Sequence, residues 1–133
     1  MAEQVATSPD ARLTGIGGWL LLLIIKLWIG AVVRFLVGIA DATHPVGVLN
    51  LAFAALGGAA AYLLGSKSPK GVMLAKIVLA ADACYYVLEL LPPISVANPF
   101  KTAGFLVASI LYIAYLFLSK RVKNTYFPAA LGK

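Results

Sequence analysis

Hydrophobic residues fill four long stretches of this chain, and short polar connectors separate them. The connectors are rich in Gly, Pro, Ser or Asn, which end helices and form turns. A helix needs about 20 mostly apolar residues to cross the hydrocarbon core of a bilayer. The pattern therefore predicts four transmembrane helices within one domain over residues 18–118. The expected spans are residues 18–38, 46–64, 72–91 and 102–118.

A closed β-barrel is the other structure that satisfies its backbone hydrogen bonds in lipid. Its strands alternate apolar and polar residues over about ten positions. Continuous runs such as LLLLII and AALGGAAAYLL do not alternate. We therefore expect an all-α membrane protein, a bundle of four transmembrane helices.

The first hydrophobic stretch also has some features of a signal peptide. Arg12 precedes it, and Ala40 and Ala42 flank a possible cleavage site. The apolar region of a signal peptide is usually about 7–15 residues long, however, and this stretch is longer and contains two cations. These properties favour a retained membrane helix.

Composition supports a membrane location. Of the 133 residues, 62% are apolar and 12% are charged, whereas soluble globular domains have about 45–50% and about 25%. A disordered chain is excluded as well, because such chains are poor in apolar and aromatic residues.

The formal net charge of +6 is explained by membrane orientation and needs no nucleic-acid partner. Seven Lys and Arg residues lie in the two terminal segments and the middle connector, which share one side of the predicted bundle. One lies in the connectors of the other side. The positive-inside rule then places both termini in the cytoplasm. Residues 1–17 form a cytoplasmic N-terminal segment and residues 119–133 a basic tail that contacts anionic lipid head groups. The seven are Arg12, Lys67, Lys70, Lys120, Arg121, Lys123 and Lys133, against Lys101.

Charged residues inside the predicted spans are costly, so their depth is informative. At a rise of about 1.5 Å per residue, Lys26 and Asp82 lie at similar depths in the first and third helices, and so do Arg34 and Glu89. We expect two ion pairs, Lys26 with Asp82 and Arg34 with Glu89. Such pairs fix the register of packed helices, or they line a path for protons or ions.

Small residues recur four positions apart in the second hydrophobic stretch. At this spacing they let two helix backbones approach closely. We expect the contact to be with another helix of the same chain, while a second subunit is the alternative. The residues are Ala54, Gly57, Gly58, Ala61 and Gly65.

The segments TGIGGWLLLL and YLFLSKRVKNTYF resemble the bacterial membrane-protein family called domain of unknown function 2569, over residues 14–127. The resemblance implies a small four-helix protein of the bacterial inner membrane with no assigned activity and no catalytic residues. By the same resemblance, Gly17, Gly18 and Trp19 form an N-terminal motif. The corresponding C-terminal motif consists of Ser119, Lys120, Arg121, Val122, Lys123, Thr125 and Phe127.

The chain offers few groups for catalysis or metal binding. It has one histidine, His44, and one cysteine, Cys84, and it lacks complete Rossmann and Walker phosphate loops. We expect a non-enzymatic membrane scaffold or accessory protein without a cofactor or metal, which associates with lipid, another membrane protein or its own copies. The alternative is a small oligomeric transporter or proton-coupled carrier. A carrier requires a polar cavity that reaches Asp82, whereas a scaffold seals the charges between helices.

Overall fold

The structure is a computed structural model that describes residues 15–92 and 98–127. These residues form five helices and no strands, and four of the helices are long and apolar enough to cross a membrane. The prediction of an all-α protein with four membrane-spanning helices is therefore confirmed at this level. The helices are α2 (Trp19–Ala40), α3 (Pro45–Gly65), α4 (Pro69–Leu90), α5 (Pro99–Leu118) and α6 (Lys120–Tyr126). Most of the N-terminal segment and the last residues of the tail lie outside the described residues.

The observed helices differ from the predicted spans by three residues or fewer at either end. The largest differences are at the starts of α4 and α5, which begin at Pro69 and Pro99. The sequence prediction assigned both prolines to connectors. Proline is well suited to the first turn of a helix, because its missing N–H would have no partner there and its φ angle is already helical.

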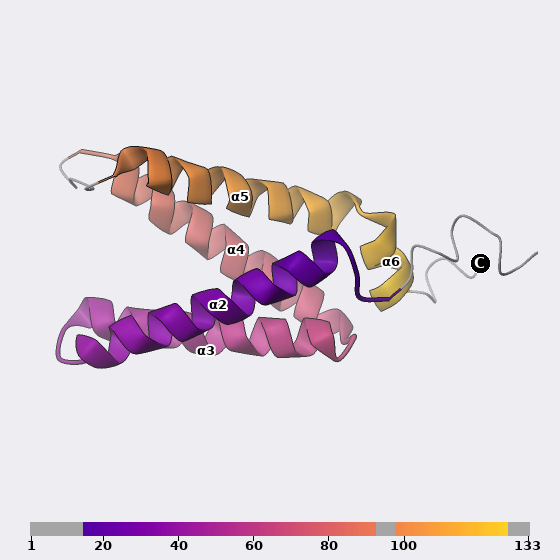
Figure 1. Ribbon diagram of the computed structural model, residues 1–133, viewed down its shortest axis with the longest axis horizontal. Coiled ribbons are helices and arrows are strands. Elements are labelled where there is room, and N and C mark those ends of the chain that lie inside the picture. The colour runs from indigo at the N-terminus through magenta and orange to yellow at the C-terminus, as the bar shows by residue number, and fades with distance from the viewer. Residues whose placement is uncertain (1–14, 93–97, 128–133) are drawn as a thin grey trace, which may run out of the picture.

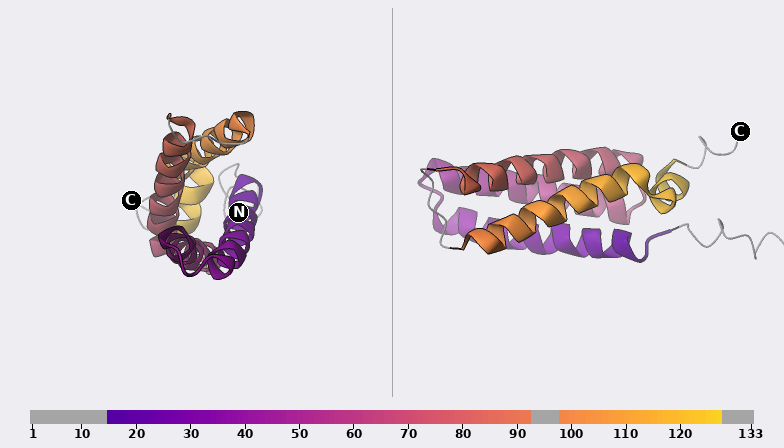
Figure 2. Two further views of the ribbon diagram at one scale, coloured as in Figure 1. Left: turned by 90° about the vertical axis from the view of Figure 1, so that its left-hand side faces the viewer. Right: turned by 90° about the horizontal axis from the view of Figure 1, so that it is seen from above.

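The helices pack in chain order. Extensive contacts join α2 to α3, α3 to α4, and α4 to α5. Figure 1 shows α2 and α3 side by side, with α4 crossing toward α5. Viewed along its length, the bundle has the shape of a C, with α2 and α5 at the two tips (Figure 2). The first and last spans are not joined along their length, and their ring contact, between Trp19 and Tyr112, lies toward the end that carries α6.

The hydrophobic core is concentrated at the end of the bundle that carries α6, which we call the α6 end. The opposite end, with the α2–α3 and α4–α5 connections, is called the far end. The core residues come from the first half of α2, the last turns of α3, the first half of α4, and the region around α6. They include Leu20, Leu23, Leu27, Ala60, Leu64, Ala75, Leu79, Leu116, Val122 and Tyr126.

Helix α5 is attached to the bundle along a narrow seam. Its buried residues are Thr102, Ser109 and Leu116, which are spaced seven positions apart and so lie on one line along the helix. Other large side chains of α5, such as Leu111 and Leu118, are exposed. The extensive contacts of α5 are with α4, and most α5 side chains are at least partly exposed.

The small residues of α3 do pack against another helix of the same chain. A Cβ atom on Gly57 or Gly58 would lie 3.8 Å from the Cβ of Ala31 in α2, and Ala54 and Ala61 are buried. Gly65 is different, since a Cβ placed there meets nothing within 4 Å.

Two closer approaches lie outside the predicted stripe. A Cβ on Gly47 would lie 1.9 Å from the carbonyl oxygen of Asp41, and one on Gly71 would lie 2.6 Å from the backbone nitrogen of Leu64. These glycines stand at the tight α2–α3 and α3–α4 connections. Glycine is needed at these two positions because a side chain would collide with the backbone of the adjacent helix or connection.

Candidate functional site

An ion pair joins α2 to α4 inside the membrane-spanning region. The Nη2 atom of Arg34 lies 2.6 Å from the Oδ1 atom of Asp82, and the two side chains are 18% and 9% exposed. That oxygen makes no well-angled hydrogen bond among the described residues, so the contact is primarily electrostatic. The Tyr86 hydroxyl is within hydrogen-bonding reach of Arg34, and the Arg34 guanidinium carbon lies 4.7 Å from the centre of the Phe53 ring.

This geometry corrects the predicted pairing. Arg34 pairs with Asp82, and the expected pair of Arg34 with Glu89 is wrong. The reason is the early start of α4: Asp82 stands 13 residues after Pro69, about 20 Å along the helix. Arg34 stands 15 residues after Trp19, at about 22 Å. The true helix start thus brings Asp82 to the depth of Arg34.

Lys26 is near the pair without forming an ion pair with Asp82. It interacts electrostatically with both Asp82 and Arg34, and its Nζ atom lies 5.8 Å from the centre of the Tyr112 ring. The predicted proximity of Lys26 to Asp82 is therefore found, but as a longer-range interaction. The carboxylate of Asp82 thus interacts with two cations, Arg34 directly and Lys26 at longer range.

Glu89 forms no ion pair with Lys26 or Arg34 within the described part of the chain. It is half-buried, and its carboxylate is within hydrogen-bonding reach of the Tyr85 hydroxyl one turn earlier in α4. Glu89 therefore has a local partner on its own helix and does not link α4 to α2.

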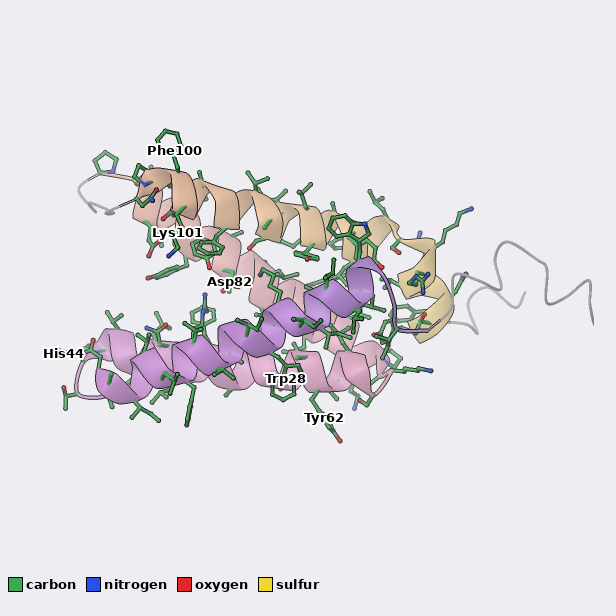
Figure 3. All side chains as sticks on the ribbon, in the orientation of Figure 1. Trp28, His44, Tyr62, Asp82, Phe100 and Lys101 are labelled. Carbon is green, nitrogen blue, oxygen red and sulfur yellow. The ribbon has the colours of Figure 1, made fainter. Side chains whose placement is uncertain are left out.

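A cleft of about 590 Å³ runs along the ion pair between α2, α4 and α5. Four charged side chains and several aromatic rings line it, together with apolar residues of α2. Figure 3 shows Asp82 toward the middle of the bundle and Lys101 on the side of α5 that faces α4, with Phe100 on the opposite side. The charged and aromatic lining residues are Lys26, Arg34, Asp82, Lys101, Phe53, Tyr86, Phe105 and Tyr112.

Aromatic rings organise the α5 side of the cleft. The Phe105 ring stacks on Tyr86 with their centres 5.7 Å apart, and the Lys101 Nζ atom lies 5.9 Å from the centre of the Phe105 ring. Tyr86 therefore contacts the wall of α5 and also approaches Arg34. These contacts connect the ion pair to the exposed lysine at the start of α5.

The charges of the cleft do not cancel. Lys26, Arg34 and Lys101 face a single carboxylate, that of Asp82. Among the described residues, neither Lys26 nor Lys101 has a carboxylate within ion-pair distance, since the ion pairs are those of Arg34 with Asp82 and of His44 with Asp41. Excess positive charge is unfavourable in a medium of low dielectric constant. The cleft is therefore electrostatically suited to an anion.

Five of the eight charged and aromatic residues that line this site were not among the predicted site residues. The sequence prediction treated Lys101 only as a cation of a connector, because it began the last span at residue 102. The other four, Phe53, Tyr86, Phe105 and Tyr112, carry no sequence signal of their own, since aromatic residues in spans are most often packing residues. Lys101 was detectable in principle, because Pro99 marks the start of its helix.

The two terminal motifs meet at the α6 end. The backbone N–H of Gly15 donates to Thr125 Oγ1 over 2.9 Å, and a Cβ on Gly17 would lie 3.1 Å from Nη1 of Arg121. Gly18 has φ of +55°, a conformation that glycine adopts at little cost. The motif glycines therefore form a turn that fits against α6.

Helix α6 occupies the first part of the basic tail that we expected over residues 119–133. The hydroxyl oxygen of Ser119 accepts from the backbone N–H of Val122 over 3.4 Å, which caps the helix. The hydroxyl of Tyr126 donates to the carbonyl oxygen of Leu64 over 2.7 Å in a buried position. Burial, with a smaller contribution from Tyr115, raises the pKa of Tyr126 to about 12. Its phenol thus remains a donor throughout the physiological pH range.

The remaining motif residues surround this contact. Trp19 is 65% exposed and packs edge-on against Tyr112, with ring centres 6.4 Å apart. Lys120 and Lys123 are exposed on α6, and Arg121 is half-buried. The hydrogen bond between Gly15 and Thr125 places both ends of the described chain at the same end of the bundle.

No metal centre is formed by the described residues, which contain no group of three His, Cys, Asp or Glu side chains close enough to hold an ion. Cys84 is exposed. Comparisons with models of protein families, with curated proteins and with solved structures gave no match.

Proposed function

We propose that this chain is a non-enzymatic membrane protein that works by binding, and that the cleft between α2 and α5 is its binding site. The observation that carries the proposal is the open cleft with three cations and one carboxylate along a membrane-spanning bundle. A purely structural scaffold would bring α2 and α5 together and seal these charges. Here the spans pack in chain order, and these charged side chains line a cleft between α2, α4 and α5.

The proposal includes a location in the bacterial inner membrane, with both termini in the cytoplasm, as a member of the family that the terminal motifs resemble. Two features support the orientation. Gly15 and Thr125 are hydrogen-bonded at one end of the bundle, and the basic residues of the α3–α4 connection and of α6 occur at that same end. The positive-inside rule then assigns the α6 end to the cytoplasm.

A pair of matched glycine substitutions tests the binding site. Gly30 lines the cleft, and a Cβ at Gly30 or at Gly104 meets nothing within 4 Å. Gly30→Leu should fill the cleft, and Gly104→Leu makes the same chemical change on the exposed surface of α5. Both variants should fold, since replacing glycine within a helix is favourable for the helix itself.

The measurement is native mass spectrometry of each variant released from membranes in a mild detergent. We expect the wild type and Gly104→Leu to retain a bound molecule of defined mass, and Gly30→Leu to lose it. The same bound mass in both variants, or none in any of the three proteins, would overturn the cleft as a binding site.

A second candidate function is a small carrier, which one observation favours. Asp82 is one of the residues that line the cleft, and a carboxylate inside a membrane-spanning region is a group that proton-coupled and ion-coupled carriers use. Purified protein in sealed vesicles should then support ion or proton flux that Gly30→Leu blocks and Gly104→Leu preserves. Equal flux in vesicles with and without protein would eliminate the carrier.

A further inference from the structure

We propose that the far end of the cleft binds the phosphate of an anionic phospholipid, with Lys101 and Arg34 contacting the headgroup and the acyl chains lying along α2. This inference rests on the proposed function and names the ligand class of the same site. Under the proposed orientation, the lipid comes from the outer leaflet.

The first argument is charge. Lys101 has no carboxylate within ion-pair distance among the described residues, and Asp82 is shared between Arg34 and Lys26. The side chains that line the cleft therefore carry a net positive charge. A phosphate would complement this charge, and arginine is well suited to phosphate because its planar guanidinium has five N–H donors, only some of which face Asp82.

The second argument is depth. Lys101 is the third residue of α5, and Arg34 stands six residues before the end of α2 at Ala40. These positions correspond to about 3 Å and about 9 Å from the far end of the helices. The two cations therefore lie close to the boundary of the hydrocarbon core, the region where phospholipid headgroups reside, and a long side chain can reach across the remaining distance.

The shape and lining of the cleft also favour a lipid. Residues of both α2 and α5 line it, and these two helices are the tips of the C in Figure 2. Its α2 wall presents Leu22, Ile25, Ile29 and Val33, all of which are 44–60% exposed. A soluble anion would leave this apolar wall without a partner. A lipid satisfies both parts of the site, with phosphate on the cations and acyl chains on the leucine, isoleucine and valine side chains.

The test measures lipid binding to the full-length, delipidated protein in a neutral detergent. Three probes are titrated and followed by native mass spectrometry: phosphatidylglycerol, phosphatidylcholine with the same acyl chains, and sn-glycerol 3-phosphate. We expect phosphatidylglycerol to bind about tenfold more tightly than phosphatidylcholine, because the net anionic headgroup forms charge-assisted contacts. Glycerol 3-phosphate should bind much more weakly than either lipid, since it lacks acyl chains.

Two variants locate the binding site. Lys101→Gln should weaken phosphatidylglycerol binding about tenfold, whereas Lys70→Gln should not change it. Lys70 is the matched control because it is also an exposed lysine in the first turn of a proline-initiated helix, but at the α6 end. Both lysines are exposed, so neither substitution should prevent folding.

Several results would overturn the inference while leaving the binding function intact. Equal affinity for the two lipids would remove the role of charge, and an unchanged affinity in Lys101→Gln would remove the role of this lysine. Tight binding of glycerol 3-phosphate would identify a soluble anion as the ligand. A dimer that excludes lipid would show that a second copy of the chain fills the cleft.

Discussion

At the level of single residues, Asp82 determines how the intramembrane charges are arranged. Its carboxylate contacts Arg34 directly and interacts with Lys26 at longer range. The sequence prediction paired Asp82 with Lys26, and Arg34 with Glu89. It missed the direct partner of Asp82 because a shift of three residues in the start of α4 moves Asp82 by about 4.5 Å along the helix axis.

Replacing Arg34 alone should therefore lower the free energy of unfolding more than replacing both Arg34 and Asp82. We expect Arg34→Gln to lower the free energy of unfolding by about 3–5 kcal/mol, because it leaves a buried carboxylate without its direct partner. The double variant Arg34→Gln with Asp82→Asn should recover most of this loss. Chemical denaturation in detergent, analysed as a double-mutant cycle, measures the coupling.

Glu89→Gln provides the contrast for this cycle. Since Glu89 interacts locally with Tyr85, we expect a loss of about 1 kcal/mol or less and no coupling with Arg34→Gln. Strong coupling between these two substitutions would restore the pairing of Arg34 with Glu89 that the sequence suggested.

At the level of elements, α6 is the feature that sequence analysis could not foresee. Seven residues with three cations carry no strong helical signal, and an isolated helix of this length is not stable in water. It forms because Ser119 caps it and because Val122 and Tyr126 are buried in the core. The motif residues around it were noticed in the sequence, but their contact with the glycine turn depends on the tertiary structure.

The hydrogen bond of Tyr126 should make stability depend on pH in the alkaline range. The pKa of Tyr126 is raised from 10.0 to about 12 in the folded protein, so folding favours the neutral phenol. This contribution is fully present below about pH 10 and is lost as the pH rises toward 12. We expect the difference in unfolding free energy between wild type and Tyr126→Phe to shrink over this interval.

The comparison with Tyr126→Phe separates this residue from the other tyrosines, which titrate in both proteins. At neutral pH the substitution should cost about 1 kcal/mol, a modest loss because the Leu64 carbonyl still accepts from the backbone N–H of Lys67. A difference that stays constant from pH 9 to pH 12 would contradict the proposed dependence.

Glycines at the helix connections should be far more sensitive than the glycine at the end of the predicted stripe. Gly47→Ala would place a Cβ 1.9 Å from the Asp41 carbonyl oxygen, whereas Gly65→Ala meets nothing within 4 Å. We expect Gly47→Ala to reduce the yield of folded protein severely and Gly65→Ala to be neutral or slightly stabilising. Size-exclusion profiles and thermal unfolding in detergent measure both effects.

At the level of the whole molecule, the sequence predicted the four spans but not their arrangement. Hydrophobic length is a local property, and it identified α2 to α5 to within three residues. The open C depends on which helices contact each other. The narrow seam of α5 and the close packing of α2 on α3 produce this arrangement. The order of the helices around the bundle cannot be predicted from either feature at the level of sequence.

The proposed orientation predicts a labelling pattern for the whole chain. In a background with Cys84 replaced by serine, a cysteine at Lys67 or Lys123 should be protected from an impermeant maleimide in intact cells. A cysteine at Thr43, in the far connection, should react. Lysis should make all three reactive. Labelling of Lys67→Cys but not of Thr43→Cys in intact cells would invert the topology.

Helix α6 also has a consequence for biosynthesis. All four spans have been translated once residue 118 has been added, yet Val122 and Tyr126 are part of the same buried cluster as Leu20 and Leu64. A chain that ends after residue 118 thus contains all four spans while its core still lacks two side chains. Chains that terminate prematurely between these points would expose apolar surface at the membrane–water boundary, where quality-control proteases could recognise them.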